Sequence, residues 1–155
     1  MLKESNRFFI SCFYLGYIPF APGTFGSILG FLFSVFIHMS WAFLLIITLI
    51  SIFLIGYHSE KDPGWIVIDE FLGMMLCLLL LKMFGPYWNI LSLSSSFLFF
   101  RLFDIWKPFP IRTIDQYLLS HKKTQSLAVI VDDLLAGIMA FVFTYLIAPP
   151  LLHAA

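Results

Sequence analysis

The sequence predicts an all-α, multi-pass membrane protein that forms one domain over residues 1–155. Hydrophobic residues make up 61% of the chain and charged residues only 12%, and the mean hydropathy is +0.95. A typical soluble domain carries about 25% charged residues, and a soluble protein of this size cannot bury so much apolar surface. The low polarity excludes the class of disordered proteins, and the net charge of zero argues against a nucleic-acid-binding protein. Each charge that remains in such a chain therefore needs a specific reason.

Long apolar stretches predict about five transmembrane or partly inserted helices. No Asp, Glu, Lys or Arg occurs between Phe8 and Ser59, a stretch far longer than the roughly 20 residues of one span. A break at His38–Trp41 divides it into helices over about 26–37 and 41–57, of which the first is either spanning or re-entrant. A Gly-Pro turn within 84–89 divides the next apolar stretch, 71–103, into two helices. A last apolar stretch, over residues 134–152, contains no charged residue and predicts a fifth helix.

The distribution of charges predicts which segments share one face of the membrane. The first four predicted helices form two hairpins, and both ends of a hairpin lie on the same side of the membrane. Residues 1–25, 58–70 and 104–133 are therefore predicted to lie on one face. Counting Arg101, at the end of the fourth predicted helix, that face holds all nine acidic residues and eight of the nine basic residues, with only Lys82 elsewhere. By the positive-inside rule this face is cytoplasmic, which places the N-terminus inside and the C-terminus outside. Pro19 argues against a cleaved signal peptide, and Cys12 and Cys77 are predicted to be buried thiols.

Carboxylates converge on this face from three predicted helix ends. Asp69-Glu70 and Asp132-Asp133 are each expected to open a helix, and both pairs interrupt apolar runs, where unpaired carboxylates are costly. A divalent cation relieves such a cluster, and Mg²⁺ fits best because it combines a few carboxylates with water and phosphate oxygens. The alternative, acidic helix caps at an interface, stays open. The predicted metal ligands are Asp62, Asp69, Glu70, Asp104, Asp132 and Asp133.

Basic residues next to this cluster predict a phosphate site. Arg101, Asp104 and Lys107 recur every three residues and so lie on one side of a helix. Arginine and lysine are suitable donors to a phosphate monoester. Contacts to lipid headgroups are the alternative, favoured for Arg112, Lys122 and Lys123. The loop over residues 19–27 is expected to cradle an anion through Gly23 and Thr24 or simply to cap the following helix.

Four blocks of the chain together resemble the phosphatidylglycerophosphatase A family, Mg²⁺-dependent membrane lipid phosphatases of bacteria. They occur in the family's order: Gly16–Ser27, Asp62–Gly73, Arg101–Pro110 and Asp132–Gly137. The resemblance implies a phosphoric monoester hydrolase of phospholipid biosynthesis that converts phosphatidylglycerophosphate to phosphatidylglycerol and inorganic phosphate. It also implies a helical protein of the bacterial inner membrane with its active site facing the cytoplasm. The metal and catalytic set that it implies is Asp69, Glu70, Asp104, Asp132 and Asp133.

Two departures from the family pattern bear on substrate preference more than on activity. Ser126-Leu127-Ala128 stands where many relatives have a glycine-rich stretch, and Trp65 occupies a position that is acidic in some members. The expected partners are a phospholipid substrate and the lipid bilayer, with no nucleic acid. The sequence does not indicate an oligomeric state.

Other functions fit the residues less well. A small cation transporter is the main alternative, but it requires charges near the membrane midplane, whereas these carboxylates lie at helix ends. A membrane scaffold leaves the paired carboxylates unexplained. The spaced motif of phospholipid-forming phosphotransferases is absent, and so is the Asp-x-Asp signature of an aspartyl-phosphate route. Direct attack by water oriented by a carboxylate is therefore favoured, without indicating which carboxylate is the base.

Overall fold

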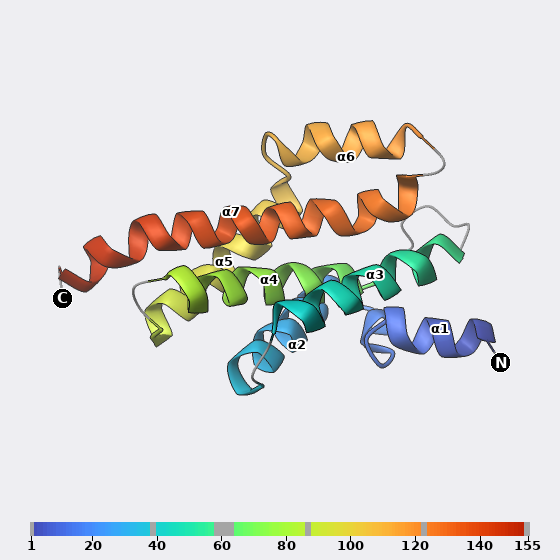
Figure 1. Cartoon of the computed structure of the whole chain (residues 1–155), viewed down its shortest axis with the longest axis horizontal. Helices are drawn as coiled ribbons and strands as arrows, with labels where there is room; N and C mark the ends of the chain where they lie inside the picture. The colour runs from blue at the N-terminus through green and yellow to red at the C-terminus, as the bar shows by residue number, and fades with distance from the viewer. Residues whose placement is uncertain (1, 38–39, 58–63, 86–87, 122–123, 154–155) are drawn as a thin grey trace.

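The protein is described by a computed structural model over residues 2–37, 40–57, 64–85, 88–121 and 124–153, in which every regular element is a helix. Figure 1 shows the long α7 running along the molecule, with α6 beside its N-terminal half and the C-terminus at the opposite end from α1. The all-α prediction is confirmed. In chain order the elements are α1 (Leu2–Ile10), the short 3-10 helix η1 (Leu15–Tyr17), α2 (Pro22–Phe36), α3 (Trp41–Tyr57), α4 (Ile68–Phe84), α5 (Ile90–Trp106), α6 (Ile111–Leu119) and α7 (Gln125–His153).

Among the described residues, one helix is long and apolar enough to cross a membrane. It is α7, over Gln125–Ile147. Shorter apolar segments occur in α2, over Pro22–Phe36, and in α3, over Trp41–Gly56. The prediction of about five transmembrane or partly inserted helices therefore stays a prediction.

Two helices begin earlier than the sequence predicted. Proline suits the first helical position, and α2 begins at Pro22; the segment expected as a loop thus already contains the first turn of α2. No Gly or Pro interrupts Gln125–Val131, and α7 begins at Gln125. The prediction that Asp132-Asp133 opens a helix is wrong, because the pair lies about two turns inside α7. Its carboxylates are consequently out of reach of the N-terminal dipole of that helix.

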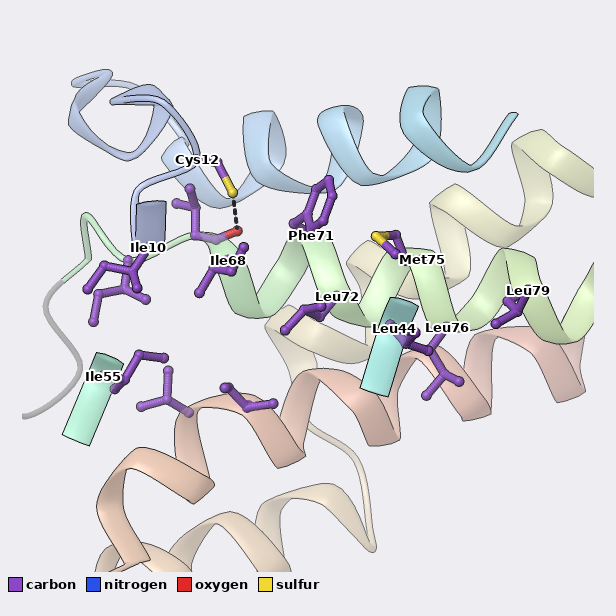
Figure 2. Packing of buried hydrophobic residues seen from close by; sticks show 14 residues of the cluster. Ile10, Cys12, Leu44, Ile55, Ile68, Phe71, Leu72, Met75, Leu76 and Leu79 are labelled. Carbon is purple, nitrogen blue, oxygen red and sulfur yellow. Dashed lines mark hydrogen bonds between the residues drawn. The ribbon is translucent and has the colours of Figure 1, made fainter. Parts of the chain in front are cut away.

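The centre of the molecule is α4, which is apolar around most of its circumference and almost entirely buried. A helix of this kind needs partners on several sides, and α4 packs mainly against α2 and α7. Figure 2 shows Phe71 on the side of α4 that faces α2, and Leu72 and Leu76 on the side that faces α7. The first turn of α4, which carries Asp69 and Glu70, is thereby fixed between two neighbouring helices.

The segment after α1 is attached to the start of α4. Val67 N–H donates to the carbonyl of Ile10 at 3.1 Å, and the Cys12 thiol donates to the carbonyl of Val67 at 3.7 Å (Figure 2). Burial, together with the charge of Glu70, raises the pKa of Cys12 to about 12. Cys12 and Cys77 are both buried and reduced, which confirms the prediction of buried thiols.

Candidate active site

A cavity of about 370 Å³ opens where α2, α4, α5 and α7 meet. This volume is within the range of small-molecule sites. The predicted convergence of the acidic segments is confirmed, because residues from all three segments line this one cavity. The lining residues are Ala21, Pro22, Gly23, Gly64, Ile66, Asp69, Glu70, Arg101, Asp104, Ile105, Lys107, Asp132 and Asp133.

Three of the predicted metal ligands form a tight acidic cluster. Asp69, Glu70 and Asp133 each place a carboxylate oxygen within 4.8 Å of the others. Asp69 is 7% exposed and Asp133 is 3% exposed. Glu70 Oε2 is buried without a hydrogen-bond partner among the described residues. Buried oxygen atoms in this arrangement are suitable ligands for a hard divalent cation.

Glycines set the distance between the two helices that carry the acidic cluster. A Cβ atom on Gly137 of α7 would collide with the carbonyl oxygen of Gly73 in α4, and one on Gly73 would lie 2.5 Å from the carbonyl oxygen of Asp133. Small residues allow helices to approach this closely. Gly73 follows Asp69 by one turn, and Gly137 follows Asp133 by one turn. The close contact therefore brings the two carboxylates together.

Glycines also bring α2 against the same end of α4. A Cβ atom on Gly26 would lie 2.6 Å from the carbonyl oxygen of Val67, and one on Gly23 would collide with Glu70 Oε1. The first turn of α2 consequently forms the wall of the cavity next to Glu70.

The two cations in the cavity are each held by carboxylates. Arg101 Nη1 donates to Asp104 Oδ2 at 2.5 Å and to Ser27 Oγ at 3.0 Å. Lys107 Nζ donates to Asp132 Oδ2 and, at 3.3 Å, to Asp115 Oδ2. Asp104 and Asp132 thus bind cations, while Asp69, Glu70 and Asp133 cluster with one another.

The environment of Lys107 keeps its side chain charged. Burial alone would lower the pKa of Lys107, but the hydrogen bonds to Asp132 and Asp115 and the charges of these carboxylates outweigh that effect and raise the pKa above its ordinary value. Lys107 therefore remains a cation at the pH at which a phosphate ester carries negative charge.

Some predicted site residues are not placed in the cavity. Asp62, a predicted metal ligand, lies outside the described residues, as do Lys122 and Lys123. Thr24 is not among the lining residues, and its N–H donates to the carbonyl of Ala21 at 2.9 Å. The expected anion cradle is thus reduced to Gly23, because the helix starts at Pro22 and uses the N–H of Thr24.

Two residues that contact the cations were not predicted from the sequence. Ser27 accepts from Arg101, and Asp115 accepts from Lys107. Asp115 carried a detectable signal, because it falls on the inner stripe of an amphipathic pattern over residues 111–118. Ser27 lies in the segment 19–27 that was expected to cradle an anion or to cap a helix, but its contact with Arg101 was not predicted.

Comparison with known proteins identifies the family. The model of the family described as Phosphatidylglycerophosphatase A matches residues 8–148, which is nearly the whole chain. The chain belongs to this family. The predicted family and the predicted enzyme class, a phosphoric monoester hydrolase, are both confirmed.

Curated relatives agree with this assignment. A phosphatidylglycerophosphatase A of Haemophilus influenzae is 33% identical over 142 residues, covering 85% of this chain and 82% of the relative. One of Escherichia coli is 29% identical over 94% of this chain and 86% of the relative. A protein of Bacteroides thetaiotaomicron that is provisionally named a phosphatidylinositol-3-phosphatase is 28% identical over 82% of this chain and 83% of the relative. No solved structure matches the chain.

Proposed function

We propose that the protein hydrolyses phosphatidylglycerophosphate to phosphatidylglycerol and inorganic phosphate, with Mg²⁺ as its cofactor, in phospholipid biosynthesis. The observation that carries the proposal is the pairing of an acidic cluster with two cations inside one cavity. A phosphate monoester requires both kinds of group, since a metal ion and cationic side chains together neutralise its oxygens. The names of the relatives from Haemophilus influenzae and Escherichia coli supply the substrate.

The residues of the acidic cluster fit Mg²⁺. Asp69, Glu70 and Asp133 offer hard oxygen ligands, and Glu70 Oε2 and Asp132 Oδ1 are buried without hydrogen-bond partners among the described residues. The proposed ligands are Asp69, Glu70 and Asp133, with Asp132, Asp104 and Asp62 as further candidates. When bound, Mg²⁺ would supply Lewis-acid polarisation of a phosphoryl oxygen.

The side chains around the cluster would bind and orient the substrate. Arg101 presents a planar fork of donors to the phosphate oxygens, and Lys107 presents a point charge. A carboxylate of the acidic cluster accepts a proton from the attacking water. The water oxygen forms a bond to phosphorus while the bond from phosphorus to the glyceryl oxygen breaks, and that oxygen takes up a proton. The products are inorganic phosphate and the glycerol lipid.

The proposed site of action is the cytoplasmic face of the bacterial inner membrane. The apolar helices α2, α3 and α7 support insertion into a bilayer, and the positive-inside rule supports the orientation. A cavity at one end of the helices would reach the headgroup without removing the acyl chains from the bilayer.

The deciding measurement is phosphate release by the purified full chain in detergent micelles. Release from phosphatidylglycerophosphate is expected with Mg²⁺, and it should stop with EDTA and return when Mg²⁺ is added in excess. Asp69→Asn should lose about 100-fold or more in kcat/KM, whereas Glu4→Gln, an exposed acid in α1, should retain full activity.

Two results would contradict the proposal. The proposed reaction is wrong if the wild-type chain releases no phosphate from this lipid. The proposed metal site is wrong if Asp69→Asn is fully active. Phosphatidylinositol 3-phosphate is the comparison substrate, because one relative is named for it. A higher kcat/KM for that lipid would reassign the substrate while leaving the reaction type unchanged.

A further inference from the structure

Asp115 lies outside the lining of the cavity, yet its carboxylate contacts a cation inside it. Lys107 Nζ donates to Asp115 Oδ2 at 3.3 Å and also to Asp132. Asp115 belongs to α6 and Asp132 belongs to α7. The ammonium group is therefore held between two elements, only one of which contributes to the cavity wall.

The position of Asp115 on α6 indicates that this contact is specific. Ile111 is buried, Ile114, Asp115 and Leu118 are half-buried, and the residues between them are mostly exposed. This spacing defines the inner stripe of an amphipathic helix, and Asp115 is the acidic member of an otherwise aliphatic stripe. Its side chain is only 14% exposed. An acid in such a position requires a partner, and Lys107 is that partner.

The backbone at Lys107 directs the side chain towards both carboxylates. Lys107 follows the last residue of α5 and has a left-handed conformation with φ of 45°, which a residue with a side chain seldom adopts. The chain then turns through Pro108–Pro110 into α6. The turn places Lys107 where α5, α6 and α7 meet, so contacts from α6 and α7 stabilise a conformation that is locally unfavourable.

We propose that Asp115 is a positioning residue that holds the Lys107 ammonium group in the wall of the cavity, where it would face the substrate phosphate. The proposal rests on the proposed function, which assigns Lys107 to the phosphate. A free lysine side chain has many rotamers, and fixing it before the substrate binds removes that entropic cost from the binding step.

Asp132 cannot take over this task alone. It lines the cavity and is itself a predicted metal ligand, so its carboxylate has competing partners whenever the site is filled. Asp115 lies outside the lining, and its contact with Lys107 does not compete with a ligand in the cavity. The two carboxylates therefore differ in what they can do for the same cation.

The test compares Asp115→Asn, Lys107→Gln and the double variant in the phosphate-release assay with Mg²⁺. Asp115→Asn should lower kcat/KM by about tenfold, mainly through a higher KM, because the cation that binds the phosphate becomes mobile. The double variant should be no worse than Lys107→Gln, because Asp115 acts through Lys107. Asp115→Glu should restore part of the loss, and Glu4→Gln is the matched control.

An independent readout uses the reactivity of Lys107 itself. Acylation of Lys107 by an amine reagent, quantified by mass spectrometry on the full chain in detergent, should rise several-fold in Asp115→Asn, since the ammonium group loses one of its two acceptors. Lys82, which lies outside the cavity lining, is the internal reference and should react equally in both proteins.

The outcomes separate this proposal from the proposed function. Unchanged kinetics in Asp115→Asn would overturn the positioning role. A double variant in which the two fold-losses multiply would also overturn it, because the free-energy contributions of Asp115 and Lys107 would then be independent. A wild-type chain that releases no phosphate would overturn the proposed function instead. The acylation result then decides whether Asp115 holds Lys107: increased labelling supports it, and unchanged labelling refutes it.

Discussion

The two sides of the cavity accommodate buried carboxylates in different ways. On the side where α5 meets α7, Asp104 and Asp132 each accept a hydrogen bond from a cation. On the side of α4, Asp69 and Glu70 lie next to Asp133 in a cluster of acids, and Asp133 is surrounded by the negative charges of Asp104, Asp69, Glu70 and Asp132. The first arrangement is neutralised by the chain, whereas the second is one that a positively charged ligand would neutralise.

The two sides of the cavity therefore differ in whether their carboxylates contribute to stability or to function. A carboxylate paired with a cation stabilises the fold, and its removal leaves the cation without its partner. A carboxylate held among other carboxylates destabilises the fold when the site has no metal, and its proposed contribution is to activity. The same conservative substitution should therefore change stability in opposite directions on the two sides.

The largest expected effect comes from Asp133→Asn in the acidic cluster. We expect kcat/KM to fall by about 100-fold or more because a proposed metal ligand is lost. Without divalent cations the melting temperature should rise, by about 2–4 °C for each kcal/mol of repulsion that is relieved. Phosphate release and a melt followed by circular dichroism in EDTA measure the two quantities.

Asp104→Asn is the matched control for that experiment, because the same change is made on the paired side of the cavity. It should lower the melting temperature in EDTA, since Arg101 would keep Ser27 but lose its carboxylate partner at 2.5 Å. A cost of about 1–3 kcal/mol is typical of a buried group left without its partner. If both variants shift the melting temperature in the same direction, the distinction between the two sides is wrong.

The convergence of the carboxylates was predictable from the sequence, but their pairing was not. Hairpins return to the side on which they start, and this rule alone placed Asp69, Asp104 and Asp133 together. The Arg101–Asp104 contact follows from a spacing of three residues on one helix. The contact of Lys107 with Asp132 depends on the left-handed backbone at Lys107 and on the turn into α6, which no local pattern indicates.

Helix boundaries were the other limit of sequence reasoning. The apolar pattern located Trp41–Tyr57 correctly, because polar breaks bound it on both sides. The charges of Asp132-Asp133 suggested a helix start that the backbone does not have, since Gln125–Val131 is already helical. The charged residues inside this apolar stretch thus indicated a pair that lines the cavity, but they indicated the wrong start for the helix.

A smaller effect is expected from widening the contact between the two helices of the acidic cluster. In Gly137→Ala the new methyl group would collide with the carbonyl oxygen of Gly73, and overpacking of this kind costs about 1–3 kcal/mol. Asp133 would move away from Asp69, so activity should fall together with the melting temperature.

Gly56→Ala is the matched control for the contact between α4 and α7. A Cβ atom at Gly56 of α3 would make only an ordinary contact, at 3.5 Å from Ser126 Oγ. Alanine is favoured over glycine within a helix by about 0.5–1 kcal/mol, so this variant should be slightly stabilised and fully active. Equal melting temperatures and activities for Gly137→Ala and the wild type would show that the close contact does not position the cluster.

The smallest effect is expected from Ser27→Ala, which tests how the cation of the paired side is held. Ser27 is fully buried. Its hydroxyl donates a hydrogen bond to the carbonyl of Gly23 at 2.8 Å and accepts one from Arg101 at 3.0 Å. One hydrogen bond contributes about 0.5–1.5 kcal/mol, so kcat/KM should fall by only about two- to tenfold. Ser34→Ala, which removes an equivalent bond to the carbonyl of Gly30 at 2.8 Å and lies outside the cavity lining, should leave kcat/KM unchanged. Because Asp104 still holds Arg101 in Ser27→Ala, a loss as large as that of Asp133→Asn would mean that the serine, and not the carboxylate, determines where the guanidinium group lies.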